Sequence, residues 1–421
     1  MESARSARCK GEAVGACVLR ILLLNQTFYP DVAATAQLLG DLAVALVEAG
    51  HEVTVVASRR GYDDAGNRFS AREVWRGVKI IRVGSTGFGK AAKWRRALDF
   101  GSFLAACGLR LAWLPRFDVV VALTSPPLIS VFGAALARWR KSRFVYWVMD
   151  FNPDEAVAAG WLREGSLATR LLERLSRFSL TQAHRIVALD RFMADRIVAK
   201  GIPRAKISVV PPWSHDDQVR FDREGRERFR RTLGLEGKFV VMYSGNHSPC
   251  HPLETLVEAA RRMVDDPALV FCFVGWGSEF RKLEAARAGG GLVNVVCLPY
   301  QPLAELAGSL SAADLHVVVM GDPFVGLVHP CKIYNILAVG APILYVGPRP
   351  SHLTEILDGL RHPRFWTEAG HGQVERLMKS VAWARQQFGD RERGESCGAG
   401  EFGRERLVPR MVGEVERLQE S

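Results

Sequence analysis

Segments typical of strands and helices alternate along this 421-residue chain. This alternation predicts an α/β protein built from two doubly wound, Rossmann-like domains that face each other across a cleft. The strand-like segments are continuous apolar runs rich in β-branched residues, as in parallel sheets covered on both faces. The alternation is broken once, by Pro211, Pro212 and Trp213 followed by a charged stretch at 222–231, and then restarts.

The first half begins with a strand at 21–24, a helix whose apolar residues recur over 38–46 and end at Gly50, and a strand at 53–56. Later strands of this half are expected at 119–123, 144–148, 185–189 and 207–210. The second half is expected to contain a helix at 253–264 and strands at 239–243, 270–274, 293–298, 315–319 and 343–346. We therefore predict a flexible extension at 1–18, domains at 19–210 and 211–395, and a final helix at 396–421 that returns to the first domain.

The composition, with 48% hydrophobic and 24% charged residues, is that of a globular protein. Lys and Arg number 56 against 45 Asp and Glu, and the resulting charge of +11 favours anionic partners such as nucleotides or phospholipid surfaces. Nucleic acid is not expected as a partner, because no basic stripe with interleaved aromatic residues is visible. The eight cysteines form no C-x-x-C pair, which indicates reduced thiols and a cytoplasmic protein. We find no apolar run long enough to cross a membrane.

The first segment that carries chemistry runs from Tyr243 to Pro252, where a strand leads through a glycine turn into a helix. Gly245 would let backbone N–H groups approach a phosphate. The alternative is an ordinary turn. His247, Cys250 and His251 do not predict a metal site, because a fourth ligand at a recognisable spacing is missing.

The second segment runs from His329 to Pro342 and is typical of a helix that has Pro330 in its first turn and ends at Gly340. Lys332 and Asn335 would share one face of this helix. A lysine there could bind a diphosphate. The alternative is a solvated lysine.

Several segments, in this order and spacing, together carry a family resemblance. They are Asn25–Pro30, Ala34–Leu39, Trp147–Asp154, Phe273–Gly277, Leu298–Tyr300, Ala313–His316 and the Pro-Cys-Lys helix with its Ala-Val-Gly-Ala-Pro ending. From Leu19 to Leu418 the chain resembles the retaining glycosyltransferases of family four, which have the GT-B fold. Within the family it resembles the envelope-polysaccharide branch, which includes colanic-acid and O-antigen enzymes.

The resemblance implies a metal-independent hexosyltransferase without a cofactor. Such an enzyme moves a sugar from a nucleotide-sugar donor, UDP- or GDP-linked, to a lipid-linked saccharide acceptor and keeps the anomeric configuration. It implies that 19–210 binds the acceptor, through Thr35 and Gln37, and that 211–395 binds the donor. The expected donor-binding residues are Gly245, Asn246, His247, His251, Gly275, Tyr300, Val328, Lys332 and Asn335.

Two departures from the family pattern concern charged residues. Many members have a glutamate pair at the positions that match Leu327 and Asn335, and here only Asn335 can still hydrogen-bond a hydroxyl. Many also have a lysine where His251 stands, so the charge at that place would depend on pH. The departures leave two alternatives open: a sugar-nucleotide epimerase of the same architecture, and a nucleotide-sugar-binding protein without activity.

Asp150 follows the strand at 144–148 and is the expected catalytic residue. Family members often have a histidine or an aspartate in this loop, and we prefer Asp150 to Asp154 as the match. A carboxylate there could orient the acceptor hydroxyl or take its proton. The alternative is that Asp150 caps a turn.

A basic cluster of Lys90, Lys93, Arg95 and Arg96 precedes an apolar stretch at 98–114, and a second basic cluster lies at 138–143. A basic helix with aromatic residues suits the headgroup region of an anionic membrane. We therefore expect the protein to lie peripherally on the inner face of the cytoplasmic membrane. The alternative is a helix packed against the sheet of the first domain.

Overall fold

A computed structural model describes residues 18–31, 33–61, 66–89, 93–214, 219–360, 365–388 and 399–419. The chain forms two compact units. The first comprises Met1–Trp147, Leu175–Val187 and Met411–Ser421, and the second comprises Val148–Arg174 and Ala188–Arg410. The predicted extension at 1–18 lies, apart from Val18, outside the described residues. The domain bounds given by the sequence stay predictions.

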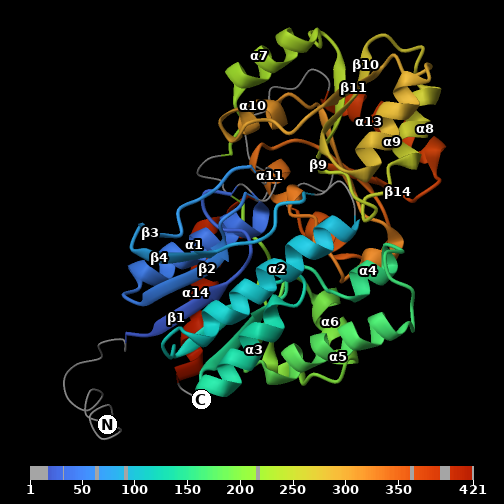
Figure 1. The fold of residues 1–421 in the computed structure, drawn as a ribbon. Coiled ribbons are helices and arrows are strands. Elements are labelled where there is room, and N and C mark those ends of the chain that lie inside the picture. The colour runs from blue at the N-terminus through green and yellow to red at the C-terminus, as the bar shows by residue number, and fades with distance from the viewer. Residues whose placement is uncertain are drawn as a thin grey trace, which may run out of the picture. The chain divides into compact units, whose positions relative to one another are not determined.

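The first sheet has eight strands in the order β3-β4-β2-β1-β5-β6-β7-β8 (Figure 1). The pair β3 and β4 is antiparallel, whereas β1 is parallel to both β2 and β5. The predicted apolar runs form β1, β2 and β5 to β8. The short strands β3 and β4 were not predicted: β3 is not buried at any position, and Lys79 and Arg82 interrupt the apolar residues of β4. The strands are β1 (Arg20–Leu24), β2 (Glu52–Ser58), β3 (Arg72–Trp75), β4 (Val78–Val83), β5 (Val119–Ala122), β6 (Arg143–Trp147), β7 (Arg185–Ala188) and β8 (Ile207–Val209).

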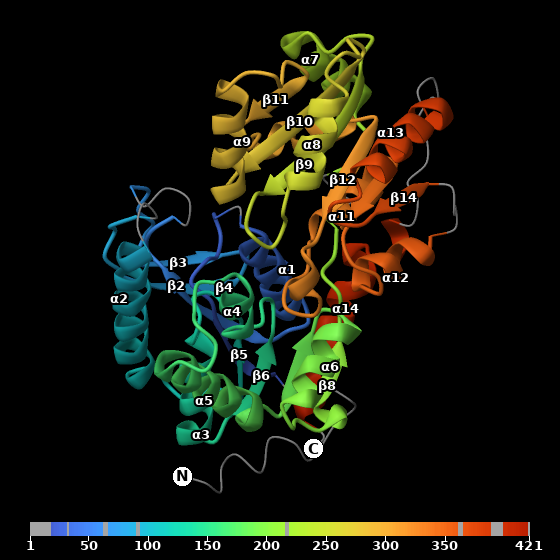
Figure 2. The same cartoon turned by 90° about the vertical axis from the view of Figure 1, so that its right-hand side faces the viewer.

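The second sheet has six strands, all parallel, in the order β11-β10-β9-β12-β13-β14 (Figure 2). Both of its faces are buried: Tyr243 and Phe271 belong to one apolar cluster, and Met242 and Cys272 belong to another. This double burial explains the continuous apolar runs in the sequence. The strands are β9 (Phe239–Asn246), β10 (Leu269–Trp276), β11 (Val295–Leu298), β12 (Leu315–Val319), β13 (Ile343–Val346) and β14 (Trp366–Ala369).

Helices pack on the sheets and on one another within each unit. In the first unit α1 packs on β2 and β4, α3 packs on β5 and β6, and α2 lies beside α3. In the second unit α13 packs on α8 and β14, and α10 packs on α7. The α-helices are α1 (Ala34–Glu48), α2 (Lys93–Ala112), α3 (Ile129–Arg140), α4 (Asp154–Ala158), α5 (Leu167–Gln182), α6 (Arg191–Ala199), α7 (Arg223–Leu233), α8 (Glu254–Arg262), α9 (Ser278–Ala288), α10 (Leu306–Ser311), α11 (Lys332–Ala338), α12 (His352–Asp358), α13 (Val374–Phe388) and α14 (Arg404–Glu416). The 3-10 helices are η2 (Arg204–Lys206), η3 (Leu303–Glu305), η4 (Asp322–Phe324), η5 (Ala399–Glu401) and η6 (Arg417–Gln419).

The order of the second sheet reverses at β9, which lies between β10 and β12. Ligands of open α/β sheets bind at the carboxyl ends of the strands at such a reversal. The glycine turn predicted from the sequence lies there, because Gly245 is near the end of β9. Among the described residues, no helix has the length and apolar character needed to cross a membrane.

Candidate functional site

The carboxyl ends of β9 and β10 approach each other so closely that one of them must lack a side chain. At Gly275 (φ +137°) a Cβ atom would lie 2.0 Å from the carbonyl oxygen of Gly245. Gly245 (φ +132°) is itself covered by the side chain of Lys332, whose Nζ would be 3.1 Å from a Cβ at that position. The two glycines therefore let the backbones of β9 and β10 approach closely, with an ammonium group against Gly245.

Lys332 is the cation of this site. Its Nζ lies 3.7 Å from the centroid of the Tyr243 ring and has no hydrogen-bond partner among the described residues. Burial lowers the pKa of Lys332 to about 7, so the ammonium is held only partly protonated at neutral pH. Such a group is ready to take up an anion. Tyr243 received no role from the sequence, although its position directly before the glycine turn is a signal that could have identified it.

His247 and His251 lie beside Lys332 but are neutral. Nδ1 of His247 is 2.8 Å from the carbonyl oxygen of Gly245, and Nδ1 of His251 is 2.7 Å from that of Val319 at the end of β12. Burial, followed by the charge of Lys332, lowers the pKa of His247 to about 3 and holds the pKa of His251 well below its usual range. His251 therefore does not supply the pH-dependent charge near neutrality that the sequence suggested. Both rings can instead donate an N–H to a carbonyl.

The other predicted donor-binding residues are less uniform in burial. Asn246 is exposed at the end of β9, whereas Val328 is buried in a small cluster with Cys250 and Phe324. Tyr300 is half exposed and lies close to Tyr243: burial raises the pKa of the Tyr243 phenol, and the charge of Tyr300 adds to this shift. Asn335 is partly buried, one helical turn after Lys332 in α11.

The helix predicted to have Pro330 in its first turn begins two residues later, at Lys332. The segment before the helix is held by side-chain contacts. The side chain of His329 contacts Asp190 and Tyr334, and the thiol of Cys331 donates to the carbonyl of His329. The seven-residue helix is short, so the contacts of the Lys332 side chain, rather than a helix dipole, define its role.

The loop after β6 brings Asp150 to the same unit as Lys332. The backbone N–H of Phe151 donates to the carbonyl of Leu327 at 2.8 Å. Burial raises the pKa of the thiols of Cys250 and Cys331, and the charge of Asp150 adds to both shifts, which places the carboxylate close to both. Burial raises the pKa of Asp150 to about 6, within the range useful for proton transfer.

The other two acidic residues of this loop, Asp154 and Glu155, each contact another side chain. Asp154 is bound in an ion pair with Lys200 at 2.8 Å. Glu155, which sequence reasoning did not single out, contacts the thiol of Cys250 at 3.8 Å and accepts from the amide of Asn152. Asp150 is thus the acidic residue of the loop whose pKa is shifted toward neutrality.

The predicted acceptor residues Thr35 and Gln37 lie in the first unit, in the first turn of α1. Thr35 Oγ1 is 3.0 Å from Thr27 Oγ1, and the amide of Asn25 donates to Thr27. This network follows β1, where the order of the first sheet reverses between β2 and β5. Each unit therefore has predicted site residues at its reversal point.

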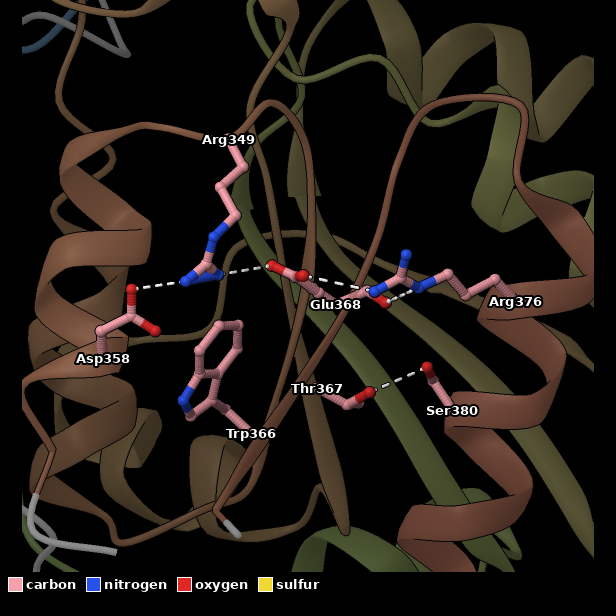
Figure 3. Close-up of a pocket in the computed structure, with 7 residues that line it drawn as sticks. All are labelled: Arg349, Asp358, Trp366, Thr367, Glu368, Arg376 and Ser380. Atoms are coloured by element: carbon pink, nitrogen blue, oxygen red, sulfur yellow. Dashed lines mark hydrogen bonds and ion pairs between the residues drawn. The ribbon is translucent and has the colours of Figure 1, made fainter. Parts of the chain in front are cut away.

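A separate open pocket of the second unit is lined by seven residues (Figure 3): Arg349, Asp358, Trp366, Thr367, Glu368, Arg376 and Ser380. Arg349 pairs with Asp358 at 2.6 Å and with Glu368 at 3.0 Å, and Arg376 pairs with Glu368 at 3.2 Å. The arginines are thus balanced by carboxylates, and none of the predicted donor-binding residues lines this pocket. It is a poorer anion site than the surroundings of Lys332.

Comparison with known proteins supports one family. Residues 34–213 match the glycosyl transferase 4-like domain. WcaI of Escherichia coli K12, assigned as a colanic acid biosynthesis glycosyl transferase, is 27% identical over 360 residues, or 81% of this chain and 86% of WcaI. Sucrose-phosphate synthase of Thermosynechococcus elongatus has a similar fold (TM-score 0.70, 15% identity, 95% of this chain and 99% of that one). So does HepE of Anabaena in complex with UDP-glucose (TM-score 0.68, 14% identity, 96% and 99%).

The lowered pKa of Lys332 predicts a stability effect that needs no ligand. A lysine whose folded pKa is about 7 binds fewer protons in the folded than in the unfolded chain between pH 7 and its usual range near 10.4, so its contribution to stability rises with pH there. Lys332→Met should therefore stabilise the protein at pH 6.5, and this advantage should shrink by about 1.4 kcal/mol for each pH unit above 7. Urea unfolding of both proteins at pH 6.5 and 9 measures this difference in the free energy of unfolding.

The exposed Lys282, paired with Glu279, gives a matched control: Lys282→Met should not show this pH trend. A constant difference between Lys332→Met and the parent would contradict the assignment.

Proposed function

Since the chain is a glycosyltransferase of family four with the GT-B fold, related to enzymes of polysaccharide biosynthesis, we propose a specific reaction for it. It transfers a sugar from a UDP- or GDP-linked donor to a lipid-linked saccharide, with retention of configuration. The bond between the sugar C1 and the diphosphate breaks, C1 bonds to an acceptor hydroxyl oxygen, and the nucleoside diphosphate leaves. The transfer is metal-independent, because Lys332 supplies positive charge for the leaving diphosphate.

The observation that carries this proposal is the position of Lys332 on the backbone of Gly245. The residue is partly buried, but its ammonium nitrogen is fully buried and has no hydrogen-bond partner among the described residues. A diphosphate bound beside Gly245 and Lys332 would supply that partner and favour the charged form. HepE, which shares the fold, has been crystallised with UDP-glucose, and this supports a nucleotide-sugar as the donor here.

A donor panel tests the reaction. The purified protein is incubated with UDP- and GDP-sugars and polyprenyl-diphosphate saccharides, and mass spectrometry should find one acceptor heavier by one sugar, with and without added Mg²⁺. NMR of the product should give the anomeric configuration of the donor. Lys332→Met should weaken binding of the donor at least tenfold by calorimetry, because a charge-assisted hydrogen bond contributes about 1.5 to 3 kcal/mol. The control Lys282→Met should bind it like the parent.

Two results of the panel would reject the reaction. An isomerised donor without any transfer would indicate an epimerase. Tight donor binding without turnover on every lipid-linked acceptor would indicate a binding protein.

Asp150 is proposed to position the acceptor hydroxyl and accept its proton. With a pKa of about 6, its carboxylate is ionised above pH 6, so turnover of the parent should rise as the pH rises through 6. Asp150→Asn should lower kcat by about 100-fold or more, lose this rise, and keep the donor affinity. Asp154→Asn, in the same loop but paired with Lys200, is the matched control and should keep kcat. If Asp150→Asn turns over as fast as the parent, Asp150 only caps the turn and does not act on the acceptor.

We further propose that α2 docks the first unit on an anionic membrane. Its apolar residues Trp94, Leu98 and Leu109, and Trp113 directly after its end, recur at helical spacing and are between 48% and 79% exposed. The opposite face, with Phe103, is buried, so packing inside the unit accounts for one face only. Trp139 and Arg140 of α3 extend the patch, since Arg140 donates to the carbonyl of Ala112 at the end of α2. Lys90 of the predicted basic cluster lies outside the described residues.

Co-sedimentation with liposomes checks the docking. Binding should rise with the fraction of anionic lipid and fall with salt, because each Lys or Arg near the surface contributes about 1 kcal/mol. Arg95→Glu with Arg96→Glu should weaken binding at least tenfold. The same change of charge at Arg72 and Lys79, exposed residues of β3 and β4, serves as the control. Protein that stays in the supernatant with anionic vesicles at low salt would refute membrane docking and favour a soluble acceptor.

A further inference from the structure

Three buried side chains of the second unit converge apart from the residues used above. Asp190 precedes α6, His329 lies in the segment before α11, and His352 begins α12. Their side chains are 6%, 1% and 2% exposed, and each offers an oxygen or nitrogen atom within 4.8 Å of the other two. The Nδ1 atoms of both histidines face the same oxygen, Oδ2 of Asp190, at 2.9 and 3.5 Å.

The remaining atoms of Asp190 and His329 are held by a second layer of hydrogen bonds. Oδ1 of Asp190 accepts from the backbone N–H of Met193 at 2.8 Å. Nε2 of His329 lies 2.6 Å from the hydroxyl of Tyr334. If Nε2 carries the proton and donates it to this hydroxyl oxygen, the lone pair of Nδ1 points toward Asp190. Histidines that bind metals typically have their second nitrogen fixed in this way.

His352 is the part of the cluster that hydrogen bonds do not explain. Neither of its ring nitrogens has a hydrogen-bond partner among the described residues, although the ring is buried and stacks on His329 with centroids 4.1 Å apart. A buried polar group without a partner is destabilising. Ligand atoms about 2.0 to 2.2 Å from one zinc ion lie roughly 3 to 3.5 Å from each other. The observed separations of 2.9 and 3.5 Å are close to this range.

We propose that Asp190, His329 and His352 bind a divalent transition-metal ion of the zinc type. Two imidazoles and one carboxylate suit Zn²⁺ or Co²⁺ better than Mg²⁺ or Ca²⁺, which prefer oxygen ligands. The ion would join α6, the segment before α11 and α12. Because His329 precedes Lys332 by three residues, this would stiffen the segment that carries the lysine. The ion takes no part in the transfer step, and the site stands independently of the proposed reaction.

Metal titration tests the site without any nucleotide-sugar. Metal-free protein lacking a histidine tag is titrated with Co²⁺, and one ion per chain should produce visible absorption bands that Zn²⁺ removes. His352→Leu and Asp190→Asn should each weaken Co²⁺ binding at least tenfold. Asn is also a favourable residue before a helix, so Asp190→Asn should keep α6 folded even if His352→Leu does not fold. His51→Gln is the control, since His51 is a buried histidine of the first unit that bonds Glu416.

Thermal unfolding provides the second measurement. Zn²⁺ should raise the Tm of the parent and of His51→Gln in a concentration-dependent way, and it should leave that of His352→Leu unchanged. The site would be refuted if the parent binds no Co²⁺, or if Asp190→Asn and His352→Leu bind it as the parent does. Circular dichroism of each variant shows whether a loss of binding comes from a loss of fold.

Discussion

The carbonyl oxygen of Gly245 occupies the space that a side chain at residue 275 would need, and the site of the second unit depends on this contact. The adjacent parallel strands β9 and β10 end here with their backbones in close contact, at the strand where the order of the sheet reverses. Lys332 comes from a distant part of the sequence and covers Gly245 from the other side. Any residue with a Cβ at position 275 would push against this backbone and change the place of the ammonium.

Burial then decides the charges around this backbone. It moves the pKa of Lys332 down to about 7 and that of Asp150 up to about 6, while the neighbouring histidines stay neutral. Both shifts have one cause, the cost of a charge removed from water. A cation and a carboxylate with such pKa values can both change protonation near neutral pH. An anion bound at Lys332 would favour the protonated form of the lysine. The anion would therefore raise the fraction of Lys332 that is charged at neutral pH.

Much of the fold could be predicted from the sequence, because buried parallel strands are continuous apolar runs. Five of the six strands of the second sheet were expected, and β14 was not. The helix expected at 253–264 forms α8. The short strands β3, β4 and β14 were missed: β3 has no buried position, β4 is interrupted by the charged residues Lys79 and Arg82, and β14 is buried only at Ala369. The comparisons support the family, and the solved structures confirm the GT-B fold, both inferred from the order of short motifs.

The candidate site could be predicted only in part. Lys332 and Gly245 stand out in the sequence, and the structure brings them together. The role of Tyr243 beneath the ammonium, and the convergence of Asp190 with His329 and His352, depend on contacts between residues far apart in the chain. Sequence spacing carries no signal for such contacts, and it also misplaced the start of α11, because side-chain contacts of His329 hold the segment before it.

Leu327 contacts the loop of Asp150 through its backbone. Its side chain is 2% exposed and apolar, where many related enzymes have a glutamate, so it cannot interact with a hydroxyl or a charge. Its backbone carbonyl nevertheless accepts from the N–H of Phe151 and thereby fixes the loop of Asp150. A backbone interaction does not depend on which side chain occupies position 327. The anchoring of the Asp150 loop is therefore independent of the side chain at position 327.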